Sequence, residues 1–482
     1  MNLKVISRNV GFALLVSALF MLLSVGVSLL EGTDSAFSAL LISFCVTFIV
    51  GGFPFLFVRR TERITLKDGY MIIVLSWLLS FVFGMLPYAL WGGPFTLVNA
   101  WFESVSGFTA TGATILEDVE SLPRSLVFWR ASTHFIGGLG VVVFLLLIIP
   151  NSSPVRLRLT NMELSSLSKD DYRSRSNKTV SIFAWVYILI CLVAIVTYRL
   201  CGMNFFDSVC HGFSVCATGG FSSRNLSIGA FHSPLISTVT IVFMIIASTH
   251  FGLIYMSIIG RSLRPLRNPV LRFYLIALAV GSIVASVSLK TNAVAATWPQ
   301  ALLDGTFHVV SYASTTGFGI SDNSNWPMLP CFVLLICSLV CGCAGSTTGG
   351  VKADRVMVLF KAVRMQIHQT LHPSSMYEIR FGKRVLHGED IYPHVLYITL
   401  FMMLLIVSTV AALLLGDPNG HAITGSIASL GNVGPSLGSI GSMGNYNLEP
   451  APLKLLFSLD MFLGRVEIYP VFAVFATLFH QK

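Results

Sequence analysis

The chain has 482 residues, of which 54% are hydrophobic and only 11% are charged. So little charge excludes an ordinary water-soluble protein and is typical of a polytopic membrane protein. The formal net charge is +9, but the basic residues gather between apolar runs. The basic excess therefore follows membrane topology, and we expect no nucleic-acid partner.

Ten apolar runs follow one another along the chain. They cover residues of about 10–30, 37–58, 70–91, 125–149, 180–200, 235–260, 270–289, 329 to beyond 350, 394–416 and 453–479. The first run is longer than the apolar part of a secretion signal, which has about 7–15 residues, so we expect a retained helix. Because about 20 apolar residues cross a bilayer, the sequence predicts an all-α integral membrane protein with ten spanning helices.

The basic residues predict the orientation of these helices. They form five clusters, which begin at Lys4, Arg59, Arg156, Arg261 and Lys352. The connections between the clusters are richer in acidic residues. Since Lys and Arg mark the cytoplasmic side of a membrane protein, both termini are expected in the cytoplasm.

Four segments between the spans resemble one another. They are Phe102-Glu103-Ser104-Val105 with Gly107-Phe108-Thr109 and Thr111-Gly112; Phe206-Asp207-Ser208-Val209 with Gly212-Phe213-Ser214 and Thr218-Gly219-Gly220-Phe221; Phe307 with Ser314-Thr315-Thr316-Gly317-Phe318; and Ser426-Ile427-Ala428-Ser429-Leu430 with Gly431-Asn432-Val433-Gly434-Pro435. The glycines Gly112, Gly219, Gly317 and Gly434 are taken as equivalent, with spacings of 107, 98 and 117 residues. A roughly constant period predicts one structural unit used four times.

Each unit is predicted to contain a span, a short helix, a glycine loop and a second span. The short segments, for example 96–107 and 299–312, cannot cross a bilayer, so we expect them to enter the membrane and return on the same side. The predicted domains are a two-span extension (1–66) and four pore repeats (67–160, 161–263, 264–385 and 386–482). Four such loops can surround one pseudo-fourfold pore, because non-helical backbone at membrane depth must be buried or line water.

The composition of the loops points to a monovalent cation. Rings of backbone carbonyls coordinate K⁺ in selectivity filters, and glycine adopts the necessary backbone conformations at little cost. No Asp or Glu lies within the glycine segments themselves, unlike the acidic rings of many cation pores. The alternative is that glycine-rich turns only connect or closely pack helices, but four recurrences in matching positions favour a pore.

The run from Leu329 to Arg364 is too long for one membrane helix. At 1.5 Å per residue it would extend about 54 Å, against a hydrocarbon core of about 30 Å. We expect an interruption at 342–350, where four glycines accompany Ser346, Thr347 and Thr348. The interruption is either a passive break or an intramembrane gate, which Lys352 would hold through a carboxylate or a carbonyl.

Arg465 is predicted to lie midway in the final span, 451–479. An arginine at that depth is costly and normally faces the bundle interior or a cavity. It is either a fixed positive charge that opposes cations below the filter, or a structural arginine bound to carbonyls at loop ends. Glu467, two residues later, would point in a different direction from Arg465 on a continuous helix, so it is not an automatic partner. Glu103 and Arg130 are expected to support the first loop structurally.

Two further groups are weaker candidates for metal chemistry. Cys341 and Cys343 form the only close pair among nine scattered cysteines, and we expect small buried residues at a helix break rather than a redox or metal site. His368 and His372 share one face of a helix without nearby ligands, so metal binding is not expected there.

At several motifs the sequence resembles the Trk/Ktr/HKT superfamily of K⁺ transporters, and specifically the bacterial TrkH/TrkG type. The motifs are Thr-Ala-Thr-Gly-Ala-Thr (109–114), Phe128-Trp129-Arg130, Gly137-Gly138-Leu139-Gly140, Ala217-Thr218-Gly219-Gly220-Phe221-Ser222, Thr315-Thr316-Gly317-Phe318, Cys343-Ala344-Gly345-Ser346-Thr347-Thr348-Gly349-Gly350, Gly431-Asn432-Val433-Gly434-Pro435 and Gly464-Arg465-Val466-Glu467. The match covers nearly the whole chain. It departs at His134-Phe135, where the family pattern has Gln-Trp.

The resemblance implies where the ion would bind and what would control it. K⁺ is expected at Thr111, Gly112, Thr218, Gly219, Thr316, Gly317, Asn432, Val433 and Gly434. The gate is expected at Gly345, Ser346, Thr347, Thr348, Gly349, Gly350 and Lys352, with Arg465 as the pore barrier. A family rule links glycine in the first loop, here Gly112, to a preference for K⁺.

The resemblance also implies channel-like K⁺ uptake across the bacterial inner membrane by a homodimer. A cytosolic, nucleotide-binding ring of the TrkA type would regulate it, since this chain has neither a Walker A motif nor a Rossmann glycine pattern after a strand. The alternative is a Na⁺- or proton-coupled secondary transporter, which predicts broken helices in inverted halves. No group of His, Asp and Glu suggests a membrane enzyme.

Overall fold

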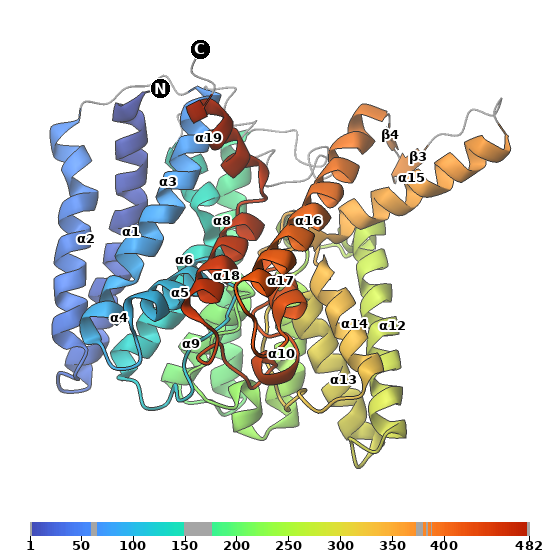
Figure 1. Cartoon of the computed structure of the whole chain (residues 1–482), viewed down its shortest axis with the longest axis horizontal. Helices are drawn as coiled ribbons and strands as arrows, with labels where there is room; N and C mark the ends of the chain where they lie inside the picture. Colours follow the sequence, from blue (N-terminus) through green and yellow to red (C-terminus); the bar gives the residue numbers. More distant parts are fainter. Residues whose placement is uncertain are drawn as a thin grey trace.

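The computed structural model describes residues 2–58, 65–148, 176–372, 379–381, 384–386 and 388–479. Parts of the basic clusters lie outside the described residues. They include Arg59, Arg60, Arg63, Lys383 and the cluster between Arg156 and Arg175. The beginning of α1 and the end of α19 lie on the same side of the molecule (Figure 1).

The described chain is almost entirely helical. Its elements are α1 Leu3–Leu30, α2 Phe37–Phe57, α3 Leu66–Gly84, α4 Leu86–Trp91, α5 Leu97–Phe108, α6 Arg124–Ile148, α8 Ser176–Leu200, α9 Phe205–Ala217, η3 Ser227–Phe231, α10 Pro234–Ala247, α11 Phe251–Ile259, η4 Arg264–Arg267, α12 Pro269–Thr291, α13 Trp298–Ala313, α14 Met328–Leu339, β1 Val340–Cys341, β2 Val351–Lys352, α15 Ala353–Leu371, β3 Ile379–Phe381, β4 Arg384–Leu386, α16 Gly388–Leu414, α17 Ala422–Leu430, η5 Gly438–Ile440, α18 Ala451–Arg465 and α19 Tyr469–Phe479.

Six of the described helices are long and apolar enough to cross a membrane, and the bent pair α10–α11 makes a seventh if it counts as one span. The six are α1, α2, the continuous α3–α4 stretch, the apolar part of α8, α12 and α16. Many of their outward side chains are large and apolar, for example Leu56 and Leu414 at 82% exposure each. Such exposure suits lipid rather than water, because soluble surfaces rarely expose large contiguous apolar patches.

Four short helices, α5, α9, α13 and α17, precede the predicted glycine loops, as expected. Their beginnings follow from capping: the side chains of Thr96, Asn204 and Thr297 accept hydrogen bonds from the amides of Asn99, Asp207 and Gln300. A polar cap satisfies an amide that has no partner within the helix. Four chain segments far apart in sequence thus supply these short helices.

The predicted interruption of the third unit is confirmed as a break in the helix. Helix α14 ends at Leu339 and α15 begins at Ala353. Between them the two-residue strands β1 and β2 pair in parallel, Val340 with Val351 and Cys341 with Lys352. This pairing holds the two ends of the glycine-rich segment 342–350 next to each other.

Three further breaks differ from the prediction of continuous spans. The run 125–149 is kinked at Gly140, whose φ of 70° and ψ of 148° are not helical. The run 235–260 is divided at 248–250, where α10 and α11 meet at 97°. The final run is divided after Arg465, because Glu467 and Ile468 adopt positive φ values of 58° and 60°. Arg465 is therefore the last residue of α18 and does not lie midway in a helix. The break buries Ile468 completely and lets Glu467 pair with Arg355 at 2.6 Å.

Candidate ion-binding loops

The four loops after the short helices share one backbone conformation. Each begins with a residue in the left-handed region, and these residues are Ala110 (φ 50°), Thr218 (54°), Thr315 (53°) and Asn432 (54°). Two residues later each loop has a glycine with positive φ: Gly112 (81°), Gly220 (87°), Gly317 (72°) and Gly434 (89°). Positive φ is strained for residues with a Cβ, and glycine avoids that cost.

The residue between these two positions forms the same hydrogen bond in every loop. Its amide donates to the carbonyl five residues earlier, at 2.9 Å in each case: Thr111 to Ser106, Gly219 to Ser214, Thr316 to Ser311 and Val433 to Ala428. Four sequences that differ at most positions therefore fold into one local structure. This supports the prediction that a single unit is used four times.

The loops also contact one another in cyclic order. A Cβ added to Gly112 would lie 2.0 Å from the carbonyl oxygen of Gly219, and one on Gly220 would lie 2.2 Å from that of Thr316. A Cβ on Gly317 would lie 2.4 Å from the oxygen of Val433, and one on Gly434 would lie 2.3 Å from that of Thr111. The fourth loop thus contacts the first, and the four backbones close a ring with no room for a side chain.

The structure shifts the expected register of the second loop by one residue. Gly220, not Gly219, is equivalent to Gly112, Gly317 and Gly434, as its φ and its contact in the ring show. Gly219 is equivalent to Thr111, and its carbonyl contacts Gly112 in the ring. The sequence contains a signal for this register, since Gly220-Phe221 matches Gly317-Phe318. The assignment of ion ligands remains a prediction.

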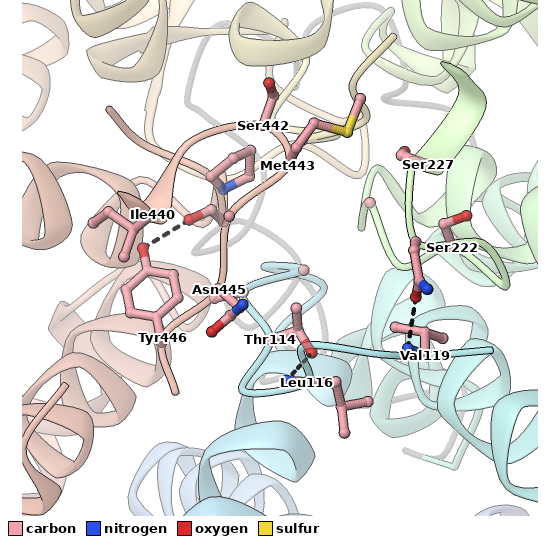
Figure 2. Close-up of a pocket in the computed structure, with 18 of the residues that line it drawn as sticks. Thr114, Leu116, Val119, Ser222, Ser227, Ile440, Ser442, Met443, Asn445 and Tyr446 are labelled. Atoms are coloured by element: carbon pink, nitrogen blue, oxygen red, sulfur yellow. Dashed lines mark hydrogen bonds between the residues drawn. The ribbon is translucent and has the colours of Figure 1, made fainter. Parts of the chain in front are cut away.

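A chamber lies beside the ring, on the side where the chain leaves the glycines. It is lined by the four glycines Gly112, Gly220, Gly317 and Gly434, by residues 440–446, and by the charged side chains of Glu117, Arg130 and Arg224. Figure 2 shows the segment from Ile440 to Tyr446 facing Thr114, Val119 and Ser222 across it. The hydroxyl of Tyr446 donates to the carbonyl of Gly434 at 2.8 Å and fixes the fourth loop.

Glu103 and Arg130 form the predicted structural support of the first loop. Arg130 Nε lies 2.5 Å from Glu103 Oε1, and both side chains are almost completely buried. The same carboxylate accepts the amide of Ile115 at 3.1 Å, and Arg130 donates to the carbonyl of Ser222 at 3.0 Å. The guanidinium also lies 3.5 Å from the ring centroid of Phe221. The pair therefore ties the first loop to the second.

We expect Glu103→Gln to lower the melting temperature of the purified protein by roughly 5 °C, because removing one partner strands a buried charge at a cost of about 3–5 kcal/mol. The matched control is Glu31→Gln, which breaks the exposed pair of Glu31 with Arg124, where the side chains are 40% and 60% exposed. Exposed pairs contribute little, so this variant should melt like the wild type. Equal melting of both variants would contradict a structural role for the buried pair.

The glycine-rich segment 342–350 lies against the opposite side of the loops, where the short helices end. The amide of Gly349 donates to Thr315 Oγ1 at 3.0 Å, and the hydroxyl of Thr347 donates to the carbonyl of Cys216 at 3.0 Å. A Cβ on Gly349 would lie 2.5 Å from the carbonyl of Gly431. The segment therefore contacts the second, third and fourth units directly.

Lys352 stabilises this segment through a hydrogen bond to its backbone. It is 6% exposed, and its ammonium donates to the carbonyl oxygen of Thr348. Of the two expected partners, a carboxylate or a carbonyl, the structure has the carbonyl. Gly345 and Gly350 turn the chain with φ values of 74° and 59°. The hydroxyl of Ser346 closes a further turn by donating to the carbonyl of Cys343 at 2.6 Å.

Arg465 joins the glycine-rich segment to α6. Its Nη1 donates to the carbonyl of Thr347 at 2.7 Å, and its Nη2 donates to the carbonyl of Gly137 at 2.8 Å. Carbonyl partners at loop ends are what the structural alternative predicts, and they place the charge directly beside the candidate gate. Sequence reasoning missed the ion pair of Glu467 with Arg355, whose guanidinium also lies 3.7 Å from the ring centroid of Tyr397.

The weaker sequence candidates are not part of the ring. Cys341 and Cys343 are buried, as expected for small residues at a helix break. His368 lies on α15 and His372 directly follows its end, with ring centroids 5.1 Å apart. His134, at the departure from the family pattern, stacks on Phe221 at 4.0 Å and contacts Ser214 Oγ at 3.1 Å, behind the second loop.

Comparisons with known proteins agree with this architecture. A family model described as a cation transport protein, TrkH, matches residues 36–482. The Trk system potassium uptake proteins TrkH and TrkG of Escherichia coli K12 are each 31% identical to the chain over 491 residues, covering all of the chain and at least 99% of each relative. The crystal structure of the potassium transporter TrkH from Vibrio parahaemolyticus matches with a TM-score of 0.89 and 26% identity over both full lengths. The chain therefore belongs to the TrkH family of cation transport proteins.

Proposed function

We propose that this chain conducts K⁺ across the bacterial inner membrane through the ring of four loops. The observation that carries the proposal is the closed ring, in which four glycines with positive φ each pack on a carbonyl oxygen of the next loop. Backbone carbonyls replace the hydration shell of a K⁺ ion. The names of the relatives, which are potassium uptake proteins, support K⁺ as the ion.

The proposed ligands come from two layers of the ring. One layer contains the backbone at Thr111, Gly219, Thr316 and Val433, and the other contains Gly112, Gly220, Gly317 and Gly434. Thr218 and Asn432, one residue earlier in their loops, are further proposed ligands, and Asn432 Nδ2 donates to Thr111 Oγ1 of the first loop at 3.0 Å. Because the short helices end at the loops, the negative ends of their dipoles favour a cation.

In the proposed topology the chain crosses the membrane ten times, with both termini in the cytoplasm. The three passages beyond the clearly apolar helices are α6, the broken α14–α15 and the broken α18–α19. The four repeats surround one pore, and two N-terminal spans lie outside it. The functional unit is a homodimer, and a cytosolic nucleotide-binding ring of the TrkA type docks on its inner face.

The proposed gate is the segment of Gly345 to Gly350 with Lys352, directly below the ring. In its present position it contacts Cys216, Thr315 and Gly431, so an ion leaving the ring meets the segment. Movement of the segment opens the path. Arg465 holds the middle of the segment, at the carbonyl of Thr347, and adds a positive charge that opposes cations.

We expect Lys352→Met to raise K⁺ flux several-fold, because the variant loses the ammonium that holds the Thr348 carbonyl and keeps a similar volume. Flux of the purified protein in liposomes measures the effect. Lys361→Met, on the helix α15 that follows, removes the same charge without touching the segment and serves as the control. Unchanged K⁺ flux in Lys352→Met would contradict the proposal that Lys352 keeps the gate in place.

The function itself is tested by K⁺ and Na⁺ flux in liposomes that contain the purified chain, with and without a cytosolic ring protein. We expect K⁺ flux down its gradient, little Na⁺ flux, and a change in K⁺ flux when the ring protein and nucleotide are added. Uptake that requires a proton or Na⁺ gradient would replace the proposal with the coupled transporter.

A further inference from the structure

A second group of polar residues lies outside the ring, at the turn between α16 and α17. Asp417, His421 and Glu449 each offer one ligand atom, and these atoms lie within 4.8 Å of one another. His421 and Glu449 are 6% and 4% exposed. Asp417 and His421 come from the turn that follows Leu414, whereas Glu449 immediately precedes α18. The fold thus brings a nitrogen and two carboxylates together from segments about thirty residues apart.

The Glu449 carboxylate is only half satisfied by the protein. Its Oε1 lies 2.8 Å from His421 Nδ1 and accepts a hydrogen bond at 3.0 Å from Asn419 Nδ2. Its Oε2 is also buried and has no hydrogen-bond partner among the described residues. The nearby ammonium of Lys454 donates instead to Asn99 and to the carbonyl of Asn447. A buried carboxylate oxygen without a hydrogen-bond partner is costly, and a bound cation would satisfy it.

The histidine is oriented as a metal ligand would be. Its Nδ1 faces the carboxylates, while Nε2 lies 3.3 Å from the hydroxyl of Ser439. With the proton on Nε2 and donated to Ser439, the lone pair of Nδ1 is free for an ion. Metal-binding histidines almost always donate their second ring nitrogen in this way, which fixes the tautomer.

Asp417 supplies a carboxylate that the backbone of the turn holds in place. The amide of Ala422 donates to Oδ2 at 2.6 Å, and the amide of Asn419 donates to Oδ1 at 3.2 Å. Each carboxylate oxygen has two lone-pair sites, so a cation can bind beside these hydrogen bonds.

We propose that Asp417, His421 and Glu449 bind a divalent transition-metal ion of the Zn²⁺ class. One imidazole nitrogen and two carboxylates suit Zn²⁺, with water in the remaining position. Mg²⁺ and Ca²⁺ fit less well, because they prefer sites composed of oxygen ligands.

The ion would tie the outer segment of the fourth loop to the end of α16. Residues 436–449 return from Gly434 to α18, and Figure 2 shows Ile440 and Tyr446 of this segment beside the chamber. Tyr446 bonds the carbonyl of Gly434, and its amide donates to Thr114 at 2.7 Å. On the proposed topology the site faces away from the cytoplasm, so the ion would come from outside.

Titration of the purified full chain with Zn²⁺ tests the site without any measurement of transport, so its failure is separate from failure of the proposed function. A His368→Ala/His372→Ala background removes the other histidine pair. We expect one Zn²⁺ per chain, and at least tenfold weaker binding in His421→Ala, Glu449→Gln and Asp417→Asn. The Gln and Asn variants preserve side-chain size, so a folding defect in His421→Ala does not decide the result. His232→Ala, an exposed histidine elsewhere, is the matched control and should bind like the background.

Hydrogen exchange gives an independent readout. Zn²⁺ should slow amide exchange in peptides of 436–449 in the background protein and leave it unchanged in Glu449→Gln. Absence of saturable Zn²⁺ binding, or equal affinity in the background and the three site variants, would overturn the site and leave His421 and Glu449 as a hydrogen-bonded pair only. Binding without added protection in 436–449 would overturn the tie to the fourth loop.

Discussion

Gly112→Ala is expected to lower K⁺ flux in liposomes on the order of a hundredfold, equivalent to about 2.7 kcal/mol in the barrier for the ion. The added methyl group would lie 2.0 Å from the carbonyl oxygen of Gly219. This neighbour is backbone and cannot rotate away, so the second loop must move. Because each loop packs on the next, one displaced carbonyl disturbs the whole ring.

The matched control for this variant is Gly92→Ala. Gly92 has the same φ of 81°, but a Cβ there meets nothing within 4 Å. Both alanines are strained by a positive φ, and only the one at Gly112 enters the ring. Near-normal flux in Gly92→Ala and collapsed flux in Gly112→Ala would assign the loss to the contact between loops.

The Gly112→Ser variant tests selectivity. The resemblance stated from the sequence links glycine at this position to a preference for K⁺, so the ratio of K⁺ to Na⁺ flux should fall. If Gly112→Ala and Gly112→Ser both conduct with the wild-type ratio, the four loops do not form the filter.

The sequence predicted the general plan of the molecule because that plan depends on hydropathy and repetition. The short helices α5, α9, α13 and α17 and the break at 342–350 appear where expected. Their signals are local: a segment too short to span, or a run too long for one helix. Glycines, threonines and a capping residue then fix the details of each loop.

Other features are not encoded in local patterns. The run 235–260 is as apolar as a continuous span, and its break depends on contacts such as the bond from Cys343 N to Ser248 O at 2.9 Å. In the second loop, Gly220 rather than Gly219 is the equivalent glycine because Thr218 has a left-handed φ. Two adjacent glycines in the sequence do not show which of them takes this position. Likewise, the partner of Glu467 is Arg355, 112 residues away. The cluster at Asp417 escaped notice because Glu449 joins it only through the fold.

Arg465→Ala is expected to raise K⁺ flux roughly 30-fold. A unit charge at a distance of roughly 8 Å, in an effective dielectric of about 20, opposes a monovalent cation by about 2 kcal/mol. The same substitution also removes the bonds to Thr347 and Gly137 that hold the candidate gate against α6. Both losses should raise K⁺ flux, so the alanine variant alone does not distinguish the effect of the charge from the effect of the two hydrogen bonds.

Arg465→Lys separates them. Lysine keeps the positive charge but presents a compact ammonium in place of the planar fork that joins two carbonyls. If the charge limits flux, Arg465→Lys should stay within about threefold of the wild type while Arg465→Ala rises, and this is the result we expect from the Coulomb estimate. If K⁺ flux in the lysine variant rises as far as in the alanine variant, the two hydrogen bonds of the guanidinium limit flux and the charge does not. Arg124→Ala, which removes an exposed arginine, controls for net charge. Wild-type flux in both Arg465 variants would leave the arginine with a structural role alone, because neither its charge nor its fork would then govern the ion.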